Sequence, residues 1–240
     1  MKIIVKRIID KLGFKLSKKL GQSLLNEDPL QATSNLIGKN PILFDVGVNQ
    51  GQTIEKMLKV FPNSKIYGFE PSKQCFDIVK KKIKNSNVII QNAAIGAEKT
   101  KLEFNEYSWS ALNSLLKRAY GNSKIIDSYE VDVITISDFC ESEKIPYINF
   151  LKTDTEGYEL NVLKGAYQMM SENKVQFILV EIFFNENYIG QSSFGDIYNY
   201  LIQNNFQLVR FYEMLYTSDG IASKTDALFL NAKFDDKLNN

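Results

Sequence analysis

The chain has 240 residues, of which 44% are hydrophobic and 24% charged, and its formal net charge is +1. This length suits one sizeable α/β domain with a short appendage, and no stretch approaches the roughly 20 apolar residues of a transmembrane helix. The chain has no histidine, which excludes a Ser-His-Asp triad and leaves Asp, Glu, Lys, Tyr or a metal-bound group as general base. The cysteines Cys75 and Cys140 form no zinc site without histidine, and they suit buried thiols in a reducing cytoplasm.

The first twenty residues are strongly basic, with six lysines, one arginine and one aspartate. Apolar residues recur there every four positions from Ile4 to Leu20, which predicts an amphipathic basic helix. Such a helix suits the anionic inner face of a membrane, and it equally suits docking on its own domain or on a partner subunit. The polar residues that follow read as a connecting segment, so residues 1–40 are expected to form an appendage and residues 41–240 the main domain.

A strand, a glycine turn and a helix are expected in residues 42–61. Ile42–Val46 is apolar except for Asp45 and predicts a buried strand, and apolar residues at helical spacing predict the helix after it. The turn has the spacing Asp-x-Gly-x-x-x-Gly, which lacks the close glycine pair of a dinucleotide-binding turn. An acid before the first glycine repels phosphate and favours a cation, such as the sulfonium and ammonium of S-adenosylmethionine (SAM). The predicted cofactor-binding residues of this turn are Asp45, Gly47, Asn49, Gln50, Gly51 and Thr53.

The next expected strand, residues 65–70, ends in a second acid. Glu70 lies 19 residues after Gly51, near the distance at which nucleotide folds place a carboxylate on ribose hydroxyls. Pro71 and Ser72 follow it directly and complete this part of the predicted cofactor site.

A third strand is expected over residues 87–92, with Asn92 and Ala93 at its carboxyl end. Doubly wound sheets bind ligands outside the carboxyl ends of their strands, so both residues are candidates for the cofactor site. For the Asn92 amide two interpretations stand: it reaches the adenine edge, or it caps its own turn.

Three motifs resemble the FkbM family of methyltransferases. They are Phe44-Asp-Val-Gly-Val-Asn-Gln-Gly51, Gly68-Phe-Glu-Pro-Ser72 and Leu151-Lys-Thr-Asp-Thr-Glu-Gly-Tyr-Glu-Leu-Asn-Val-Leu-Lys-Gly-Ala166, and Val180-Glu181 fits as well. The resemblance runs from about Pro41 to Leu230 in the family's order. It implies a class I SAM-methyltransferase fold, which is α/β, Rossmann-like and doubly wound, with a mostly parallel seven-stranded sheet whose last strand is antiparallel.

The same resemblance implies a function. Characterised members of the family mostly methylate hydroxyls, often on sugars or polyketide-type products. SAM is therefore the expected cofactor, and a hydroxyl-bearing small molecule or glycan is the expected acceptor.

The remaining pattern fits that sheet. Further strands are expected over residues 147–153, 175–182, 206–212 and 226–230, and helices over 136–142 and 194–201. Alternating segments at 100–105 and 128–135 predict a hairpin-like pair at one side of the sheet. The long insertion 106–127 is expected to face the acceptor, and its Trp109 either stacks on a ring of a ligand or plugs an irregular loop.

The predicted catalytic residues are Asp154, Glu181 and Lys152. In the arrangement that the resemblance implies, Asp154 after the fourth strand and Glu181 at the end of the fifth point at the transferred methyl group. Lys152 is expected to hold the carboxylates ionised rather than to act itself. Alternatively, the acids of residues 154–156 only stabilise the start of the next helix, because acids favour a helix N-terminus. This interpretation suits Glu156 better than Asp154.

A sugar hydroxyl is a poor nucleophile at neutral pH, so either a carboxylate base or a divalent cation is expected to activate it. Asp154 and Glu181, with Asn185 as a third ligand, are oxygen donors that suit magnesium or manganese. The metal-independent base is favoured, because the block offers only two well-aimed carboxylates and because Lys152 would repel a dication.

Two other functions compete with methyl transfer. An NAD(P)-dependent Rossmann oxidoreductase needs the glycine pair that this turn lacks. A non-catalytic SAM-binding module is the other, and the intact Asp45, Glu70 and Asp154 argue against it. Basic residues beyond the N-terminus form no long run, so no nucleic-acid partner is expected.

Overall fold

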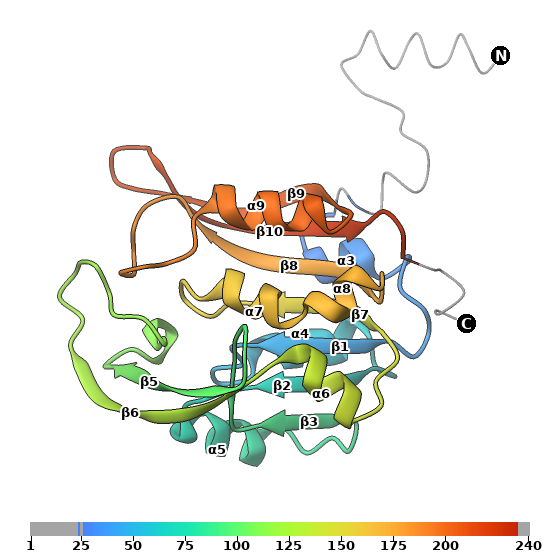
Figure 1. Ribbon diagram of the computed structural model, residues 1–240, viewed down its shortest axis with the longest axis horizontal. Helices are drawn as coiled ribbons and strands as arrows, with labels where there is room; N and C mark the ends of the chain where they lie inside the picture. Colours follow the sequence, from blue (N-terminus) through green and yellow to red (C-terminus); the bar gives the residue numbers. More distant parts are fainter. Residues whose placement is uncertain (1–23, 25, 235–240) are drawn as a thin grey trace, which may run out of the picture.

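The computed structural model of the chain describes residue 24 and residues 26–234 (Figure 1). The basic helix expected over residues 1–20 lies outside these described residues, and both of its interpretations stay predictions. Among the described helices, none is long and apolar enough to cross a membrane.

A seven-stranded sheet forms the centre of the part of the chain that the structure describes (Figure 1). Its strands, in spatial order, are β3 (Val88–Gln91), β2 (Lys65–Phe69), β1 (Ile42–Val46), β7 (Ile148–Thr153), β8 (Val175–Phe183), β10 (Ala222–Asn231) and β9 (Phe206–Tyr216). The pairs from β3 to β8 are parallel, whereas β10 runs antiparallel to both β8 and β9. The expected class I arrangement with an antiparallel last strand is confirmed.

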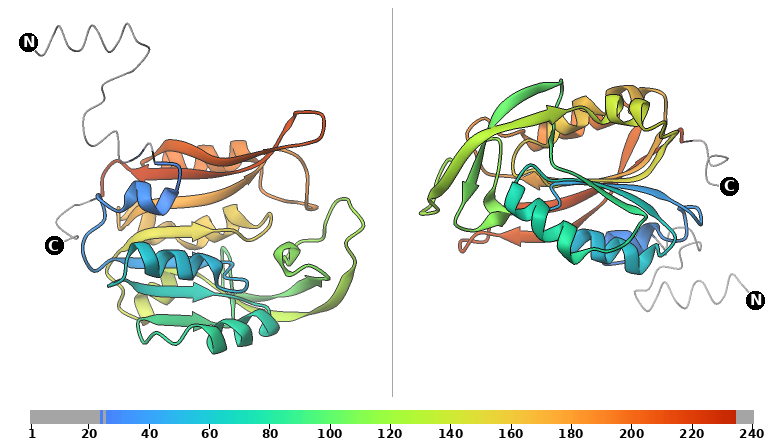
Figure 2. Two further views of the ribbon diagram at one scale, coloured as in Figure 1. Left: turned by 180° about the vertical axis from the view of Figure 1, so that it is seen from behind. Right: turned by 90° about the horizontal axis from the view of Figure 1, so that it is seen from below.

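Helices cover both faces of this sheet (Figure 2). One face packs against α3 (Pro29–Thr33), α4 (Gln52–Val60) and α5 (Lys73–Lys82), and the other against α6 (Ile136–Ser142), α7 (Glu159–Gly165), α8 (Tyr167–Ser171) and α9 (Phe194–Gln203). Successive residues of a strand point to opposite faces, so Leu43 joins the core under α4 while Phe44 joins the core under α6. All nine residues of β8 are buried because both faces are covered, as its strongly apolar sequence predicts.

Local sequence explains how the two helices beside the predicted cofactor site begin. α4 starts after Gly51, which has a φ of 85°, a left-handed conformation that costs glycine little because it has no Cβ. α5 starts at the N-cap Ser72, whose hydroxyl oxygen accepts a hydrogen bond from the Cys75 amide at 3.2 Å.

A second, three-stranded sheet has the order β4 (Ala94–Ile95), β6 (Ile125–Ile134) and β5 (Thr100–Tyr107). The antiparallel pair of β5 and β6 confirms the expected hairpin-like pair and is longer than its alternating segments predicted. The connection between β5 and β6, which includes the 3-10 helix η1 (Ser110–Leu112), lies beyond the carboxyl ends of β1, β7 and β8 (Figure 1). The insertion 106–127 therefore lies on the side of the sheet where ligands are expected.

Candidate active site

A cavity of about 450 Å³ opens at the carboxyl ends of the central strands. It is lined by Val46, Gly47, Asn49, Phe69, Glu70, Pro71, Ala94, Ile95, Phe104, Trp109, Ser110, Ala111, Leu112, Asn113, Leu115, Arg118, Asp154, Thr155, Glu156, Tyr158, Phe183, Asn187, Leu215, Ser223 and Lys224. β1 lies between β2 and β7, so successive crossovers leave it in opposite directions and open a crevice there. The cavity is thus at the topological switch point of the sheet.

Gly47 lies where the turn after β1 meets the turn after β7. A Cβ at this position would lie 1.9 Å from the carbonyl oxygen of Asp154, which no side chain could tolerate. Its φ of 86° is left-handed as well. Glycine is therefore required here for the turn after β1 to approach the turn after β7, and this packing brings the two halves of the site together.

Glu70 lies on the cofactor side of the cavity and is nearly buried. Its carboxylate accepts backbone N–H groups from Asn49 at 2.7 Å and from Ser72 at 2.8 Å. Burial raises the pKa of Glu70 to about 8, against the two amide hydrogen bonds, which lower it. A carboxylate has about four acceptor positions, so two remain for hydroxyl groups of a ligand.

Five of the predicted site residues line the cavity, namely Gly47, Asn49, Glu70, Pro71 and Asp154. The other predicted cofactor residues do not line it; they are Asp45, Gln50, Gly51, Thr53, Ser72, Asn92 and Ala93. The Asn92 amide donates to the carbonyl oxygens of Glu70 and Pro71, at 2.9 and 3.0 Å, so it caps the turn after β2 and not its own turn.

Asp45 has no direct access to the cavity because it is fully buried. Among the described residues, neither of its carboxylate oxygens has a hydrogen-bond partner, and the ammonium that pairs with it is that of Lys152, 3.7 Å from Oδ1. Burial raises the pKa of Asp45 to about 6, although the charge of Lys152 lowers it. Asp45, the acid before the first glycine, therefore faces the Lys152 ammonium and not a cation of the cofactor.

Lys152 also pairs with Asp154, whose Oδ2 lies 2.9 Å from its ammonium. Burial by itself would raise the pKa of Asp154, but the ammonium groups of Lys152 and Lys224 hold that pKa below its ordinary value. The predicted role of Lys152, to keep a carboxylate ionised, agrees with this geometry. Lys152 does not line the cavity and acts through Asp154.

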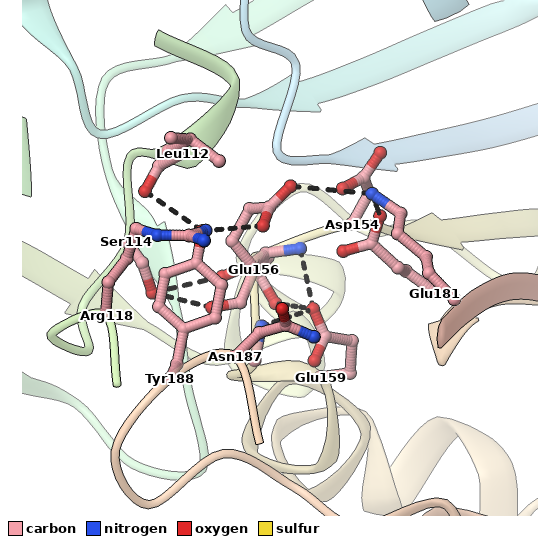
Figure 3. A network of polar contacts seen from close by, with 12 residues as sticks. Leu112, Ser114, Arg118, Asp154, Glu156, Glu159, Glu181, Asn187 and Tyr188 are labelled. Carbon is pink, nitrogen blue, oxygen red and sulfur yellow. Dashed lines mark hydrogen bonds and ion pairs between the residues drawn. The ribbon is translucent and has the colours of Figure 1, made fainter. Parts of the chain in front are cut away.

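Three carboxylates meet at the ends of β7 and β8 (Figure 3). Asp154, Glu156 and Glu181 each bring one oxygen within 4.8 Å of the others. The Lys224 ammonium from β10 contacts Glu181 closely and lies 3.7 Å from Glu156. Burial and the neighbouring carboxylates Asp154 and Glu156 raise the pKa of Glu181 well above its usual range, whereas the pKa of Asp154 is lowered.

The alternative interpretation of Glu156, as an acid of a helix start, does not describe the structure. Glu156 has a φ of 54° in the turn before α7 and lines the cavity, where its Oε2 accepts the Tyr188 hydroxyl at 2.7 Å (Figure 3). The acid at the helix start is Glu159, whose Oε1 accepts the backbone amides of Thr155 at 2.9 Å and Gly157 at 3.1 Å. Burial raises the pKa of Glu156 to about 7, near the optimum for a proton acceptor at neutral pH.

Two carboxylates, Asp154 and Glu181, were expected to aim at the reaction site. The structure adds Glu156 as the third oxygen donor, the place expected for Asn185. The Asn185 amide instead donates to the carbonyl oxygen of Ala222 at 3.4 Å. Three oxygen donors suit magnesium or manganese, but two ammonium groups already neutralise them, Lys152 at Asp154 and Lys224 at Glu181 and Glu156. A dication would have to displace Lys224, so the donor set does not fit a metal centre as it stands.

The insertion 106–127 forms the outer wall of the cavity. Trp109 lies at the rim with 65% of its surface exposed, so it is no plug of an irregular loop. The adjacent Ser110 hydroxyl donates to the Asn49 side-chain oxygen at 3.0 Å and accepts from the Gln50 amide at 3.4 Å. These contacts tie the insertion to the turn after β1.

The sequence did not reveal four residues that line the cavity and form what is here called its far wall: Arg118, Asn187, Leu215 and Lys224. Nor did it reveal Tyr188, which contacts Arg118. Their only signal in the sequence is that they lie in the long insertion or close to the ends of expected strands. Lys224 reaches the site because β10 pairs antiparallel with β8, which sets it opposite Phe183. No local pattern encodes that register.

The strand order and the cavity at the switch point are those of the class I methyltransferase fold. The Methyltransferase FkbM domain model matches residues 45–208, more than half of the chain. This chain belongs to the FkbM methyltransferase family. Its strand order and its family both contradict a nicotinamide-dependent reductase as the alternative.

Two curated relatives are methyltransferases by name. "Hexuronic acid methyltransferase AglP" of Haloferax volcanii is 30% identical over 148 residues, which are 60% of this chain and 56% of that protein. "Methyltransferase 1" of Beauveria bassiana is 28% identical over 142 residues, which are 51% of this chain and 57% of that protein. The matched region thus spans a little over half the length of these relatives.

Solved structures of similar shape include an rRNA methylase from Streptococcus thermophilus, with 10% identity and a TM-score of 0.48 over 88% of this chain and 93% of that one. Another is M. capricolum TrmK in complex with S-adenosyl-homocysteine, with 11% identity and a TM-score of 0.49 over 91% of this chain and 70% of that one. These likenesses are distant.

Proposed function

We propose that this methyltransferase uses SAM to methylate a hydroxyl group of a sugar, on a glycan or a related small molecule. The observation that carries the proposal is that two carboxylates, Asp154 and Glu156, line the same cavity as Gly47 and Glu70. One side of the cavity thus offers acceptors for ribose hydroxyls, and the other offers a base. The hexuronic acid methyltransferase among the relatives supports a sugar as the acceptor.

The hydrogen-bonding groups of the cavity support SAM as the cofactor. SAM supplies a methyl group on a positively charged sulfur. The open acceptor positions of Glu70 suit the two ribose hydroxyls. No close glycine pair is present for a pyrophosphate, which agrees with a cofactor that lacks phosphate.

The carboxylates divide the work of proton transfer. Glu156, with its pKa of about 7, takes the proton of the acceptor hydroxyl as the methyl group is transferred. Asp154 stays ionised beside Lys152 and stabilises positive charge that develops at that hydroxyl. Lys224, which pairs with Glu156 and Glu181, and Glu181, which bonds to Asp154, hold the two carboxylates in place. Alignment of methyl and hydroxyl contributes about 7–11 kcal/mol, more than the base, which contributes about 10²–10⁴ in rate.

Methyl transfer from radiolabelled SAM to glycans of the source cell tests this proposal. Label is expected in sugar, and mass spectrometry of the products identifies the methylated position. Mild alkali then separates the two linkages that a uronic acid allows, because a methyl ester is hydrolysed and a methyl ether is stable. A label that is stable in alkali supports methylation of a hydroxyl, whereas a label that alkali removes indicates that a carboxylate is methylated instead.

Binding and turnover separate the remaining alternatives. Calorimetry is expected to show binding of SAM and of S-adenosyl-homocysteine and no measurable binding of NAD. SAM binding without label in any glycan or small-molecule fraction would indicate a non-catalytic module instead.

A further inference from the structure

Arg118 is a cation on the wall of the cavity that the proposed reaction does not use. It lies in the insertion 106–127, between η1 and β6. Its backbone is held on two sides, because its amide donates to the Tyr107 hydroxyl at 2.9 Å and because it forms a β-bridge with Tyr188. The guanidinium thus projects from a fixed point of the wall.

Two aromatic rings and two hydrogen bonds hold the guanidinium itself. Its central carbon lies 5.3 Å from the ring centre of Tyr188 and 5.4 Å from that of Tyr120. Nε donates to the Tyr120 carbonyl oxygen at 3.3 Å, and Nη1 donates to the Tyr188 hydroxyl at 3.4 Å. A guanidinium has five N–H donors, so most of them stay available to a ligand.

No carboxylate neutralises this charge within the part of the chain that the structure describes. The ion pairs there include Lys152 with Asp154 and Lys224 with Glu181, but none with Arg118. The other two cations of the site are therefore compensated by the chain, and Arg118 is not. A preorganised, uncompensated guanidinium is suited to the bidentate binding of a carboxylate or a phosphate.

The position of Arg118 relates that anion to the proposed base. Tyr188 lies between the two groups: its hydroxyl accepts from Arg118 at 3.4 Å and donates to Glu156 at 2.7 Å (Figure 3). These two hydrogen bonds place the guanidinium and the Glu156 carboxylate within about 6 Å of each other. That separation is about the width of one sugar ring, so one monosaccharide can reach both groups.

We propose that the acceptor sugar carries an oxyanion, a carboxylate as in a uronic acid or a phosphate, and that Arg118 binds it while the hydroxyl to be methylated faces Glu156. The inference rests on the proposed function and narrows its substrate class. Arg118 is then a specificity-determining residue, and the Tyr188 hydroxyl positions both groups.

The test is a titration of the full chain, with and without S-adenosyl-homocysteine, against p-nitrophenyl glucuronide, p-nitrophenyl glucoside and p-nitrophenyl glucoside 6-phosphate. At least one anionic glycoside is expected to bind about 10- to 100-fold more tightly than the neutral glucoside, the range of one or two charge-assisted hydrogen bonds. Preference for the glucuronide or for the phosphate identifies the source of the anion. Equal affinity for all three would overturn the proposal.

Variants assign the preference to Arg118. Arg118→Met should reduce the preference for the anionic glycosides to near unity. Arg118→Lys should retain part of that preference, because an ammonium keeps the charge but loses the bidentate geometry of the guanidinium. Lys117→Met is the matched control, since that neighbour lies on the surface paired with Glu103 at 3.1 Å, and the preference should persist. A full preference in a folded Arg118→Met variant contradicts the inference, and thermal unfolding reports whether the variant is folded.

The proposed function is tested separately from this inference. It fails if no methyl group is transferred from SAM, a step that this titration does not need.

Discussion

The ammonium of Lys152 lies 2.9 Å from Oδ2 of Asp154, two residues further along the chain at the end of β7. The same ammonium lies 3.7 Å from the buried carboxylate of Asp45 on β1. β1 and β7 pair in register at these positions, since Asp45 stands beside Lys152 in the sheet. One lysine therefore links the turn of the cofactor side to the carboxylate of the reaction side.

Lys152→Met should move the pH profile of methyl transfer. Lys152 lowers the pKa of Asp154, so its removal raises that pKa, and the part of the acidic limb of the kcat profile that lies below the Glu156 pKa of about 7 should shift to higher pH. Loss of the cation should also destabilise the fold, because it leaves the buried Asp45 carboxylate without its nearest ammonium. Lys164→Met, at an exposed position of α7, is the control. An unchanged acidic limb would show that Asp154 need not be ionised.

Asp154→Asn should lower kcat about 10²–10⁴-fold with SAM affinity nearly unchanged. The amide keeps the size of the side chain but not the negative charge. Activity of the natural sequence is expected to persist in EDTA, because Lys152 and Lys224 already neutralise the three carboxylates. Turnover that stops in EDTA and returns with magnesium would establish a metal centre at Asp154, Glu156 and Glu181 instead.

Glu156→Gln tests the proton acceptor directly. The pKa of Glu156 is raised to about 7, and only the ionised form can take a proton. Activity should therefore rise with pH up to about 7 and then level off, and the variant should lose that limb together with about 10²–10⁴ of the rate. Tyr188→Phe removes the hydrogen bond at Oε2 and should shift the same limb to higher pH. A Glu156→Gln enzyme with full activity would leave Asp154 as the base.

Glu70→Ala should weaken SAM binding by about 2–4 kcal/mol, the loss of two hydrogen bonds to a charged group. The carboxylate must be ionised to accept both ribose hydroxyls, so affinity in the natural sequence should rise as pH passes the pKa of about 8. Calorimetry at about one pH unit on either side of that value measures both effects. Glu103→Ala, an exposed acid on β5, is the control. Unchanged affinity in Glu70→Ala would remove this residue from the ribose.

The basic helix predicted over residues 1–20 is tested by truncation. If it binds membranes, its removal should release the protein from anionic vesicles while SAM binding persists. Salt should also release the full chain, since attraction between exposed charges is screened within about 8 Å at physiological ionic strength. Equal recovery with vesicles before and after truncation favours the docked helix.

The sequence by itself determined the central sheet and the elements that build it. The apolar stretch of β1, the helical spacing of apolar residues in α4, the glycines of the first turn and Pro62 after α4 all act over a few residues. The elements β1, α4 and β2 therefore follow from local pattern. The same local reading identified Glu70 and Asp154 at the ends of buried strands. Strand ends of a parallel sheet meet at one edge, which is why these two line a common cavity.

Only the tertiary structure decided the far wall of the site. Glu156 turns into the cavity because its backbone adopts a left-handed conformation before α7, and the helix start falls to Glu159. Lys224 and Arg118 reach the site through a strand register and a bridge between segments distant in sequence. Such contacts depend on which surfaces pack together, and the free energy of packing is summed over the whole core, so no short stretch of the chain specifies them.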